Sequence, residues 1–169
     1  MSRTLTGIIQ PAGPQAALRP VYTPEERARR DATRWTLVQG LLAPLQFVVF
    51  LASLGLIVRY LATGEGWAVA AASVVAKTLV LYLIMVTGAI WEKVVFGQYL
   101  LAPAFYWEDM FSFAVIALHT AYIFGLLSGA LSPESLMFLA LAAYGTYVIN
   151  AAQFILKLRL ARLDMAVAK

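Results

Sequence analysis

Residues 91–109 read WEKVVFGQYLLAPAFYWED, and this stretch decides how the rest of the chain is divided. It contains no charged residue between Lys93 and Glu108, so it is too apolar for an ordinary water-exposed loop. Gly97 and Pro103 nevertheless interrupt it, and one continuous helix rarely runs through both residue types. The stretch therefore predicts an apolar connection that lies at the membrane interface or re-enters the protein, between two helices.

The composition of the whole chain is that of a membrane protein. Of its 169 residues, 62% are hydrophobic and 13% are charged, with a mean hydropathy of +0.77. Soluble domains are nearer half apolar and a quarter charged. The absence of cysteine excludes disulfides and thiolate chemistry, and a single histidine excludes a multi-histidine metal site. The net charge of +4 gathers at the chain ends, which does not indicate nucleic-acid binding.

Four apolar spans are predicted, at about 35–61, 67–90, 110–131 and 134–156. Each is long enough to cross a hydrocarbon core of ~30 Å at a rise of ~1.5 Å per residue. The fold class is therefore all-α: a polytopic membrane protein with four transmembrane helices in a compact bundle. Small residues that permit close helix contact recur at Ala68, Ala72, Ala76, Ala140, Ala143 and Gly145.

The chain divides into a flexible N-terminal tail at 1–21, a transmembrane domain at 22–164 and a C-terminal tail at 165–169. The domain opens with a short amphipathic helix, for which Thr23 is the expected N-cap and Glu26 the partner in a capping box. Its arginines would face anionic headgroups, or would simply be flanking charges of the first span.

Lysine and arginine placement predicts the orientation. Six lie before the first span, four follow the fourth, and Lys93 lies in the 91–109 connection, whereas only Arg59 is near the other side. The positive-inside rule therefore places both termini and this connection in the cytoplasm, as expected for a multi-pass protein of an inner membrane.

Polar residues inside the spans are the first candidates for function, because such groups are costly in a bilayer. They include Gln46, Lys77, His119, Asn150 and Gln153. Most lie in the cytoplasmic half by helical rise. Three acids border the same half: Glu92, Glu108 and Asp109. A cleft that opens to the cytoplasm and is rimmed by these acids is the expected site.

Each candidate also has a plainer interpretation. His119 is a helix–helix hydrogen-bond partner, a proton donor or a magnesium ligand. Lys77 is expected to extend toward the far interface or to pair with a carboxylate. Asn150 and Gln153 serve helix association as often as ligand binding. The acids could be helix-end charges.

The aromatic residues of the connection and the start of the third span also have two interpretations. These residues are Phe96, Tyr99, Phe105, Tyr106 and Trp107. Individually they are typical of an interfacial belt, but together they would suit a flat aromatic ligand. The chain has no glycine-rich phosphate loop, HExxH motif or nucleophile elbow.

Four blocks of sequence resemble a known family. They are YTPEERARRDATRWTLVQGLLAPLQF (22–47), WEKVVFGQYLLAPAFYWEDMFSF (91–113), ALHTAY (117–122) and YVINAAQFILKLRLARLD (147–164). Together they are similar to the 3-vinyl bacteriochlorophyllide hydratase (chlorophyllide 3-vinyl hydratase) family of bacteriochlorophyll biosynthesis. The resemblance implies a carbon–oxygen lyase that hydrates the C3 vinyl group of chlorophyllide or bacteriochlorophyllide to 1-hydroxyethyl. It implies no cofactor and no resident metal, because magnesium is carried within the substrate.

The hydration chemistry gives the candidate residues hypothetical roles. Glu108 or Glu92 would protonate the vinyl group and Asp109 would orient or deprotonate the water, while His119 would approach the substrate magnesium or relay a proton. The five aromatic residues would stack on the macrocycle, and Lys93 or an arginine of the first helix would hold its propionate. Three amides complete the predicted substrate contacts: Gln46, Asn150 and Gln153.

Two other functions compete with this one. A non-catalytic pigment-binding or assembly subunit of the photosynthetic apparatus would use the same aromatic residues without needing three acids. A small transporter would show matching broken spans in its two halves, but only Pro44 interrupts a span here. The expected partners are the substrate, the lipid bilayer, and other pigment-synthesis enzymes or further copies of the chain.

Overall fold

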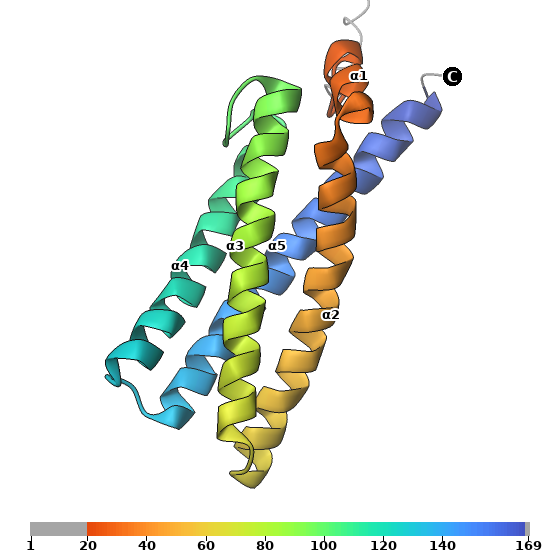
Figure 1. The fold of residues 1–169 in the computed structure, drawn as a ribbon. Coiled ribbons are helices and arrows are strands. Elements are labelled where there is room, and N and C mark those ends of the chain that lie inside the picture. The colour runs from red at the N-terminus through yellow and green to blue at the C-terminus, as the bar shows by residue number, and fades with distance from the viewer. Residues whose placement is uncertain (1–19, 168–169) are drawn as a thin grey trace, which may run out of the picture.

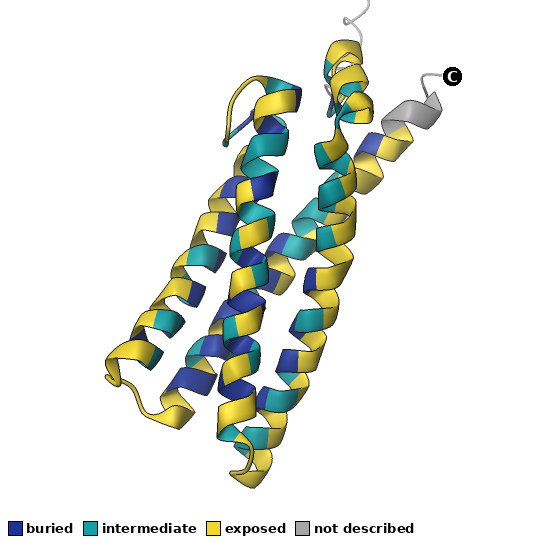
Figure 2. Cartoon of the chain, viewed as in Figure 1, coloured by how far each residue is buried: buried dark blue, intermediate teal, exposed yellow. Residues whose placement is uncertain are grey.

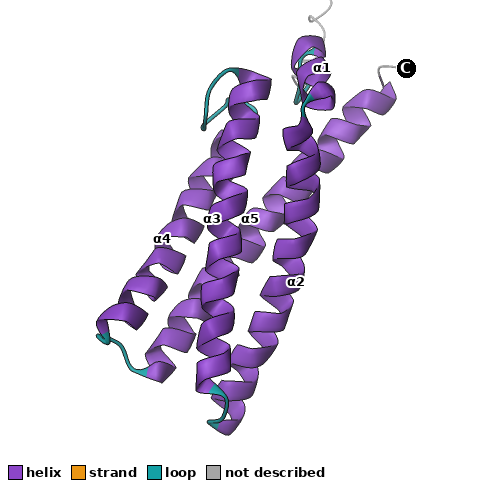
Figure 3. Cartoon of the chain, viewed as in Figure 1, coloured by secondary structure: helices purple, strands orange, loops and turns teal. Residues whose placement is uncertain are grey.

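The structure, a computed structural model, describes residues 20–167, with side chains as far as residue 163. All regular secondary structure in the described residues is helical, and loops join the helices (Figure 3). Its helices are α1 (Pro24–Ala32), α2 (Arg34–Thr63), α3 (Trp67–Phe96), α4 (Tyr106–Ser128) and α5 (Pro133–Val167). This confirms the all-α prediction. Almost all of the predicted tail at 1–21 lies outside the described residues.

Four of these helices, α2 to α5, are long and apolar enough to cross a membrane, as predicted. Their ends differ from the predicted spans around the 91–109 stretch. Helix α3 continues beyond Ile90 to Phe96, and α4 begins at Tyr106 and ends at Ser128, before the predicted Leu131. Only residues 97–105 remain as a connection, because Gly97 at φ +86° ends α3 with its N–H bonded to Lys93 O at 3.1 Å.

The helices form two antiparallel pairs, α2 with α3 and α4 with α5 (Figure 1). Helix α5 crosses the bundle obliquely: it lies beside α4 at one end and reaches α2 and α1 at the other. The 97–105 connection, α1 and the end of α5 consequently share one end of the molecule (Figure 1). Figure 2 shows buried residues on the inward faces and exposed residues outside. Many of the exposed residues are large and apolar, as expected for helices in lipid.

The faces that meet in the bundle are not all those predicted. Ala140 and Ala143 are fully buried, as expected, but Gly145 is exposed. On α3, Ala68, Ala72 and Ala76 are exposed, and Ala70 and Ala71 are buried in their place. The small-residue prediction for this helix was wrong because α3 is apolar on every side, so its alanines do not reveal its orientation. The buried Lys77 does reveal the orientation of α3, because it shares a face with the buried Ala70 and Val74.

Buried side chains form three zones along the bundle. One apolar cluster, around Phe50, Leu81, Val115 and Tyr147, occupies the half that is remote from α1. An aromatic cluster of Tyr22, Trp91, Phe96, Phe105 and Phe154 occupies the end beside α1. Polar side chains lie between the two clusters or beside the aromatic cluster, and we call them the polar layer: Gln46, Glu92, Glu108, Asp109, Ser112, Asn150, Gln153 and Lys157.

Helix α1 has the predicted capping box. Thr23 Oγ1 accepts the Glu26 N–H at 3.2 Å, and the Glu26 carboxylate accepts the Thr23 N–H at 2.8 Å. The basic face is partly used by the protein itself, since Arg29 Nε donates to Val95 O at 2.7 Å and Arg30 lies 4.8 Å from the Tyr22 ring. Helix α1 therefore covers the end of α3 and the aromatic cluster.

We predict that Thr23→Ala loosens α1 without disturbing the bundle. Loss of this N-cap removes about 1 kcal/mol of helix stability, which corresponds to roughly fivefold more frequent opening. Trypsin cleavage at the arginines of α1, followed in native membranes, should accelerate by that factor. Thr146→Ala, which removes only a bond within α5, is the control, and equal cleavage rates would contradict the prediction.

Candidate functional site

The structure brings two of the predicted acids together beneath the 97–105 connection. Leu101 N–H donates to Asp109 Oδ2 at 2.6 Å, and the next amide, Ala102 N–H, donates to Glu92 Oε2 at 3.3 Å. The two carboxyl groups also interact with each other. They are 5% and 2% exposed, so they form a buried pair and not the open rim that the sequence predicted. We call Glu92 and Asp109 the carboxyl pair.

The backbone that holds the carboxyl pair is strained. Leu101 has φ +60°, the only positive φ of a non-glycine residue in the described part of the chain. Such a conformation disfavours an L-residue by about 1–2 kcal/mol. The strained conformation of Leu101 persists because its N–H donates the short hydrogen bond to Asp109. The pairing of the two acids and the shape of the connection therefore depend on each other.

Glu108 points to a different neighbour from Asp109, although the two are adjacent in the first turn of α4. Its Oε1 lies 3.2 Å from Lys157 Nζ of α5, and this ammonium also donates to Ala104 O at 2.7 Å. Its Oε2 is buried and has no hydrogen-bond partner among residues 20–163. Sequence analysis missed Lys157; its position two helical turns after Asn150, on the same face, was the available signal.

Asn150 links α5 to α4 farther from α1 than the Glu108–Lys157 ion pair does. Its Nδ2 donates to Ser112 Oγ at 2.8 Å, and Ser112 Oγ donates to Glu108 O at 2.9 Å. Gln153 lies on the adjacent turn of α5, and Gln46 of α2 is 3% exposed. Sequence analysis also missed Ser112, which is recognisable only by its spacing of four residues from Glu108.

The predicted aromatic residues separate into two groups. Phe96 and Phe105 are packed in the aromatic cluster, where Phe105 stacks on Phe154 at 5.9 Å between ring centroids and meets Trp91 edge-on at 5.6 Å. Burial in this cluster raises the pKa of the Tyr22 hydroxyl, an effect that the nearby Arg30 opposes. The second group is exposed on the outside: Tyr99, Tyr106 and Trp107, at 60%, 42% and 68%.

Lys93 stands beside the exposed group. Its Nζ donates to Gly97 O at 2.7 Å, at the end of α3, and lies 5.3 Å from the centre of the Tyr99 ring. The ammonium therefore sits next to the connection and not beside the buried acids. This position is compatible with an anionic substituent at the surface.

His119 and Lys77 lie apart from the other candidates, within the deeper apolar cluster. Lys77 Nζ is 3.1 Å from His119 Nε2 and 3.9 Å from the centre of the Tyr147 ring, and His119 Nδ1 lies 2.8 Å from Val115 O. The expectation that Lys77 extends outward or meets a carboxylate was wrong. The histidine and the electron-rich ring face satisfy the ammonium inside the protein.

These contacts also limit His119. Both ring nitrogens are engaged, so binding the substrate magnesium would require one of these bonds to break. No group of three or more metal-ligating side chains occurs within the described residues.

Comparison with known proteins agrees with the sequence resemblance. The profile of the family described as 2-vinyl bacteriochlorophyllide hydratase matches residues 22–160. This chain belongs to that family. A relative from Cereibacter sphaeroides named 2-vinyl bacteriochlorophyllide hydratase is 68% identical over 162 residues, 95% of this chain and 100% of the relative. One of the same name from Rhodobacter capsulatus is 68% identical over 147 residues, 86% of this chain and 85% of the relative.

The hydratase match includes the whole polar layer, from Gln46 to Lys157. The family name numbers the vinyl-bearing carbon 2, whereas the numbering used above is 3. No solved structure matches this chain.

We predict that Lys157→Met destabilises this hydratase-family protein. Removing the ammonium leaves the Glu108 carboxylate buried without its counter-ion, which should lower the free energy of unfolding by about 1–3 kcal/mol. Thermal unfolding in detergent micelles measures the loss, with Lys93→Met as the control for loss of a surface lysine.

The double variant Lys157→Met with Glu108→Gln should recover part of the stability, because it removes the buried charge as well. If Lys157→Met and the control Lys93→Met melt at the same temperature, Glu108 and Lys157 do not form a stabilising pair.

Proposed function

We propose that this protein adds water to the C3 vinyl group of chlorophyllide or bacteriochlorophyllide, forming a 1-hydroxyethyl group, as a hydro-lyase. The relatives' names supply the reaction. The carboxyl pair, held on two successive amides beneath an apolar connection, is the observation that supports it best. Two acids in contact give the acid and the base that hydration of an alkene needs.

The proton balance can be written for this pair. Two carboxylates in contact repel each other, so the pair is most stable when it holds one proton. The protonated member gives this proton to the terminal CH₂, where the alkene electrons form the new C–H bond. A cation is left on the carbon next to the macrocycle, and a water oxygen bonds to it. The proton lost from that oxygen returns to the other carboxylate.

Glu108 has a separate role in this scheme. Its ion pair with Lys157 fixes the direction of the carboxylate. A fixed negative charge near the developing cation stabilises the transition state without any rearrangement of the protein. Glu108 is therefore assigned electrostatic stabilisation, while Glu92 and Asp109 exchange protons.

The flat substrate is proposed to lie against the exposed rings of Tyr99, Tyr106 and Trp107 at the membrane interface. The 97–105 connection would have to lift so that the vinyl group reaches the carboxyl pair beneath it. Lys93, beside Tyr99, would then hold the propionate. A crevice of about 290 Å³ offers a second position for this carboxylate; its lining includes Arg30 and Arg162.

Several further assignments belong to this proposal. The enzyme uses no resident metal or redox cofactor, since protons and water are the only reactants added. Its four spans would lie in the bacterial inner membrane with the 97–105 connection on the cytoplasmic side. Association with other pigment-synthesis enzymes or with further copies of the chain is also proposed.

We predict that Glu92→Gln and Asp109→Asn each lower vinyl hydration at least about 100-fold, because each removes one half of the proton transfer. Glu108→Gln should reduce turnover less, since it removes charge stabilisation only. Membranes that contain each variant are incubated with vinyl chlorophyllide in ¹⁸O-water, and labelled hydroxyethyl product is measured. The exposed Glu134→Gln is the control.

Full turnover by all three acid variants, at normal membrane levels, would remove the carboxyl pair from the mechanism. Binding of the pigment by the wild-type protein without any labelled product would instead favour a non-catalytic pigment-binding subunit. The two failures are therefore distinct.

We also predict the orientation. A reporter protein that is active only in the cytoplasm should be active when fused after Lys169 and inactive when inserted next to Glu65, which follows α2. The reverse pattern would place the carboxyl pair on the other side of the membrane and contradict the proposed substrate route.

A further inference from the structure

Four side-chain oxygens of the polar layer are buried and lack a hydrogen-bond partner in the described chain. They are Glu108 Oε2, Gln46 Oε1, Asn150 Oδ1 and Gln153 Oε1. We propose that these oxygens bind a small cluster of ordered water molecules between α2, α4 and α5, from which the water for hydration is drawn. This inference rests on the proposed function for its catalytic part, but not for the binding of water.

The four oxygens share one chemical property. All four are acceptors, so their common ligand must be a hydrogen-bond donor. A buried acceptor left without a donor destabilises the protein by about 1–3 kcal/mol, and here Gln46, Glu108 and Asn150 are only 3%, 6% and 8% exposed. Water donates two hydrogen bonds and is the usual ligand of such groups in protein interiors.

The positions of these oxygens also suit a common ligand. The Asn150–Ser112 and Lys157–Glu108 contacts join the same faces of α4 and α5, and Gln153 lies between those two levels on α5. Helix α2 joins them because Phe50 packs on Tyr147 at 5.1 Å between ring centroids. One turn from this contact toward α1, the antiparallel helices α2 and α5 carry Gln46 and Asn150.

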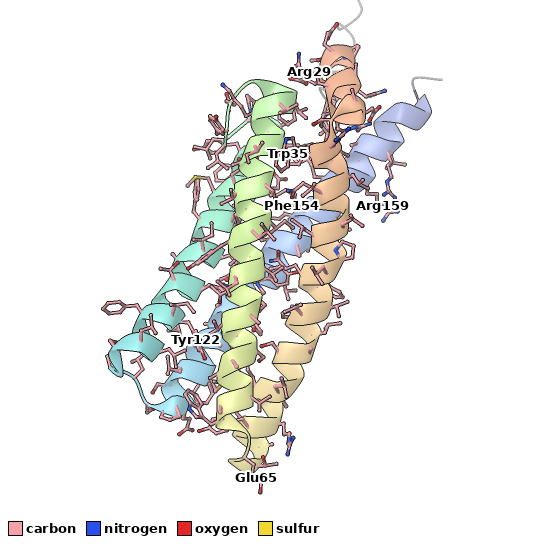
Figure 4. The ribbon with its side chains drawn as sticks, viewed as in Figure 1. Arg29, Trp35, Glu65, Tyr122, Phe154 and Arg159 are labelled. Carbon is pink, nitrogen blue, oxygen red and sulfur yellow. The ribbon has the colours of Figure 1, made fainter. Side chains whose placement is uncertain are left out.

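Apolar clusters close this layer on both sides. In Figure 4, Tyr122 lies in the half remote from α1, and Phe154 lies nearer to α1. Tyr122 belongs to the deeper apolar cluster and Phe154 to the aromatic cluster. The two clusters therefore shield water held between them from both ends of the bundle.

A bound cation fits the layer less well than water. Glu108 is the one carboxylate among the four acceptors, and Lys157 Nζ lies 3.2 Å from it. The ammonium already neutralises this charge and would repel a second cation. The amide oxygens then remain as neutral acceptors, which suits water.

The layer also adjoins the carboxyl pair. Ser112 lies one helical turn beyond both Glu108, which faces α5, and Asp109, which faces α3 through Glu92. Glu108 and Asp109 belong to the same turn of α4. Water bound at Glu108 Oε2 therefore lies on the side of this turn that faces α5, next to the proton-transferring Asp109. We assign Gln46 and Asn150 as positioning residues for the attacking water.

The binding of water is tested first, on the wild-type protein without substrate. X-ray radiolysis generates hydroxyl radicals from bound water, and these oxidise adjacent side chains within milliseconds. We expect oxidation of Tyr147, one turn from Asn150, and a severalfold decrease in both Gln46→Leu and Asn150→Leu. Absence of oxidation in the wild-type protein would overturn the proposal, whatever the protein's hydration activity.

The catalytic role is tested with the same variants. Gln46→Leu and Asn150→Leu should each lower kcat at least tenfold and leave KM within twofold, because substrate binding is unaffected. Gln39→Leu is the matched control: it is on the same helix, but its amide already donates to Thr87 Oγ1 at 2.8 Å, so its kcat should change little.

The outcomes separate this inference from the proposed function. Reduced Tyr147 oxidation with unchanged kcat would make the water structural and overturn its role in hydration. Lower kcat in the leucine variants, together with full activity in Glu92→Gln and Asp109→Asn, would uphold the water cluster and reject the carboxyl pair. Oxidation that depends on Na⁺ in the buffer would indicate a cation site and overturn the proposal.

Discussion

Polar side chains that enter a bilayer must find their partners within the protein, and the arrangement of this bundle depends on that constraint. Apolar surface does not drive helices together in lipid, because lipid tails are as apolar as leucine. Packing and polar contacts must do so. The ammonium of Lys77 on His119 orients α3 against α4, and the Ser112–Asn150 and Glu108–Lys157 contacts orient α4 against α5.

The same constraint concentrates reactive groups in one layer. Three acids lie beside the aromatic cluster, and the connection at 97–105 covers two of them with its backbone amides. An apolar covering strengthens every charge interaction beneath it and excludes bulk water. These are useful conditions for protonating an alkene, since the proton donor is shielded and the cation meets a fixed carboxylate. Strain at Leu101 is consistent with a segment whose shape serves the site.

The family relationship and the geometry contribute different parts of the functional proposal. The names of the relatives supply the reaction but do not identify any residue. The contacts indicate which residues can act together: the carboxyl pair, the ion-paired Glu108 and the amides around them. They also separate His119 from this group, because its ring nitrogens are used within the deeper cluster. The proposed proton chemistry therefore involves carboxyl groups and not the histidine.

The amino-acid sequence by itself determined the helical class, the four spans and the capping box of α1, because these depend on local composition and spacing. It also placed the three acids near one end. Only the tertiary structure decided which faces meet, as Ala72, Lys77 and Lys157 illustrate. The transmembrane helices are apolar all round, so their periodicity carries little information about orientation. The polar side chains select it through partners that are distant in sequence, and the 91–109 stretch unites Glu92 with Asp109 only when its nine-residue connection, 97–105, folds over them.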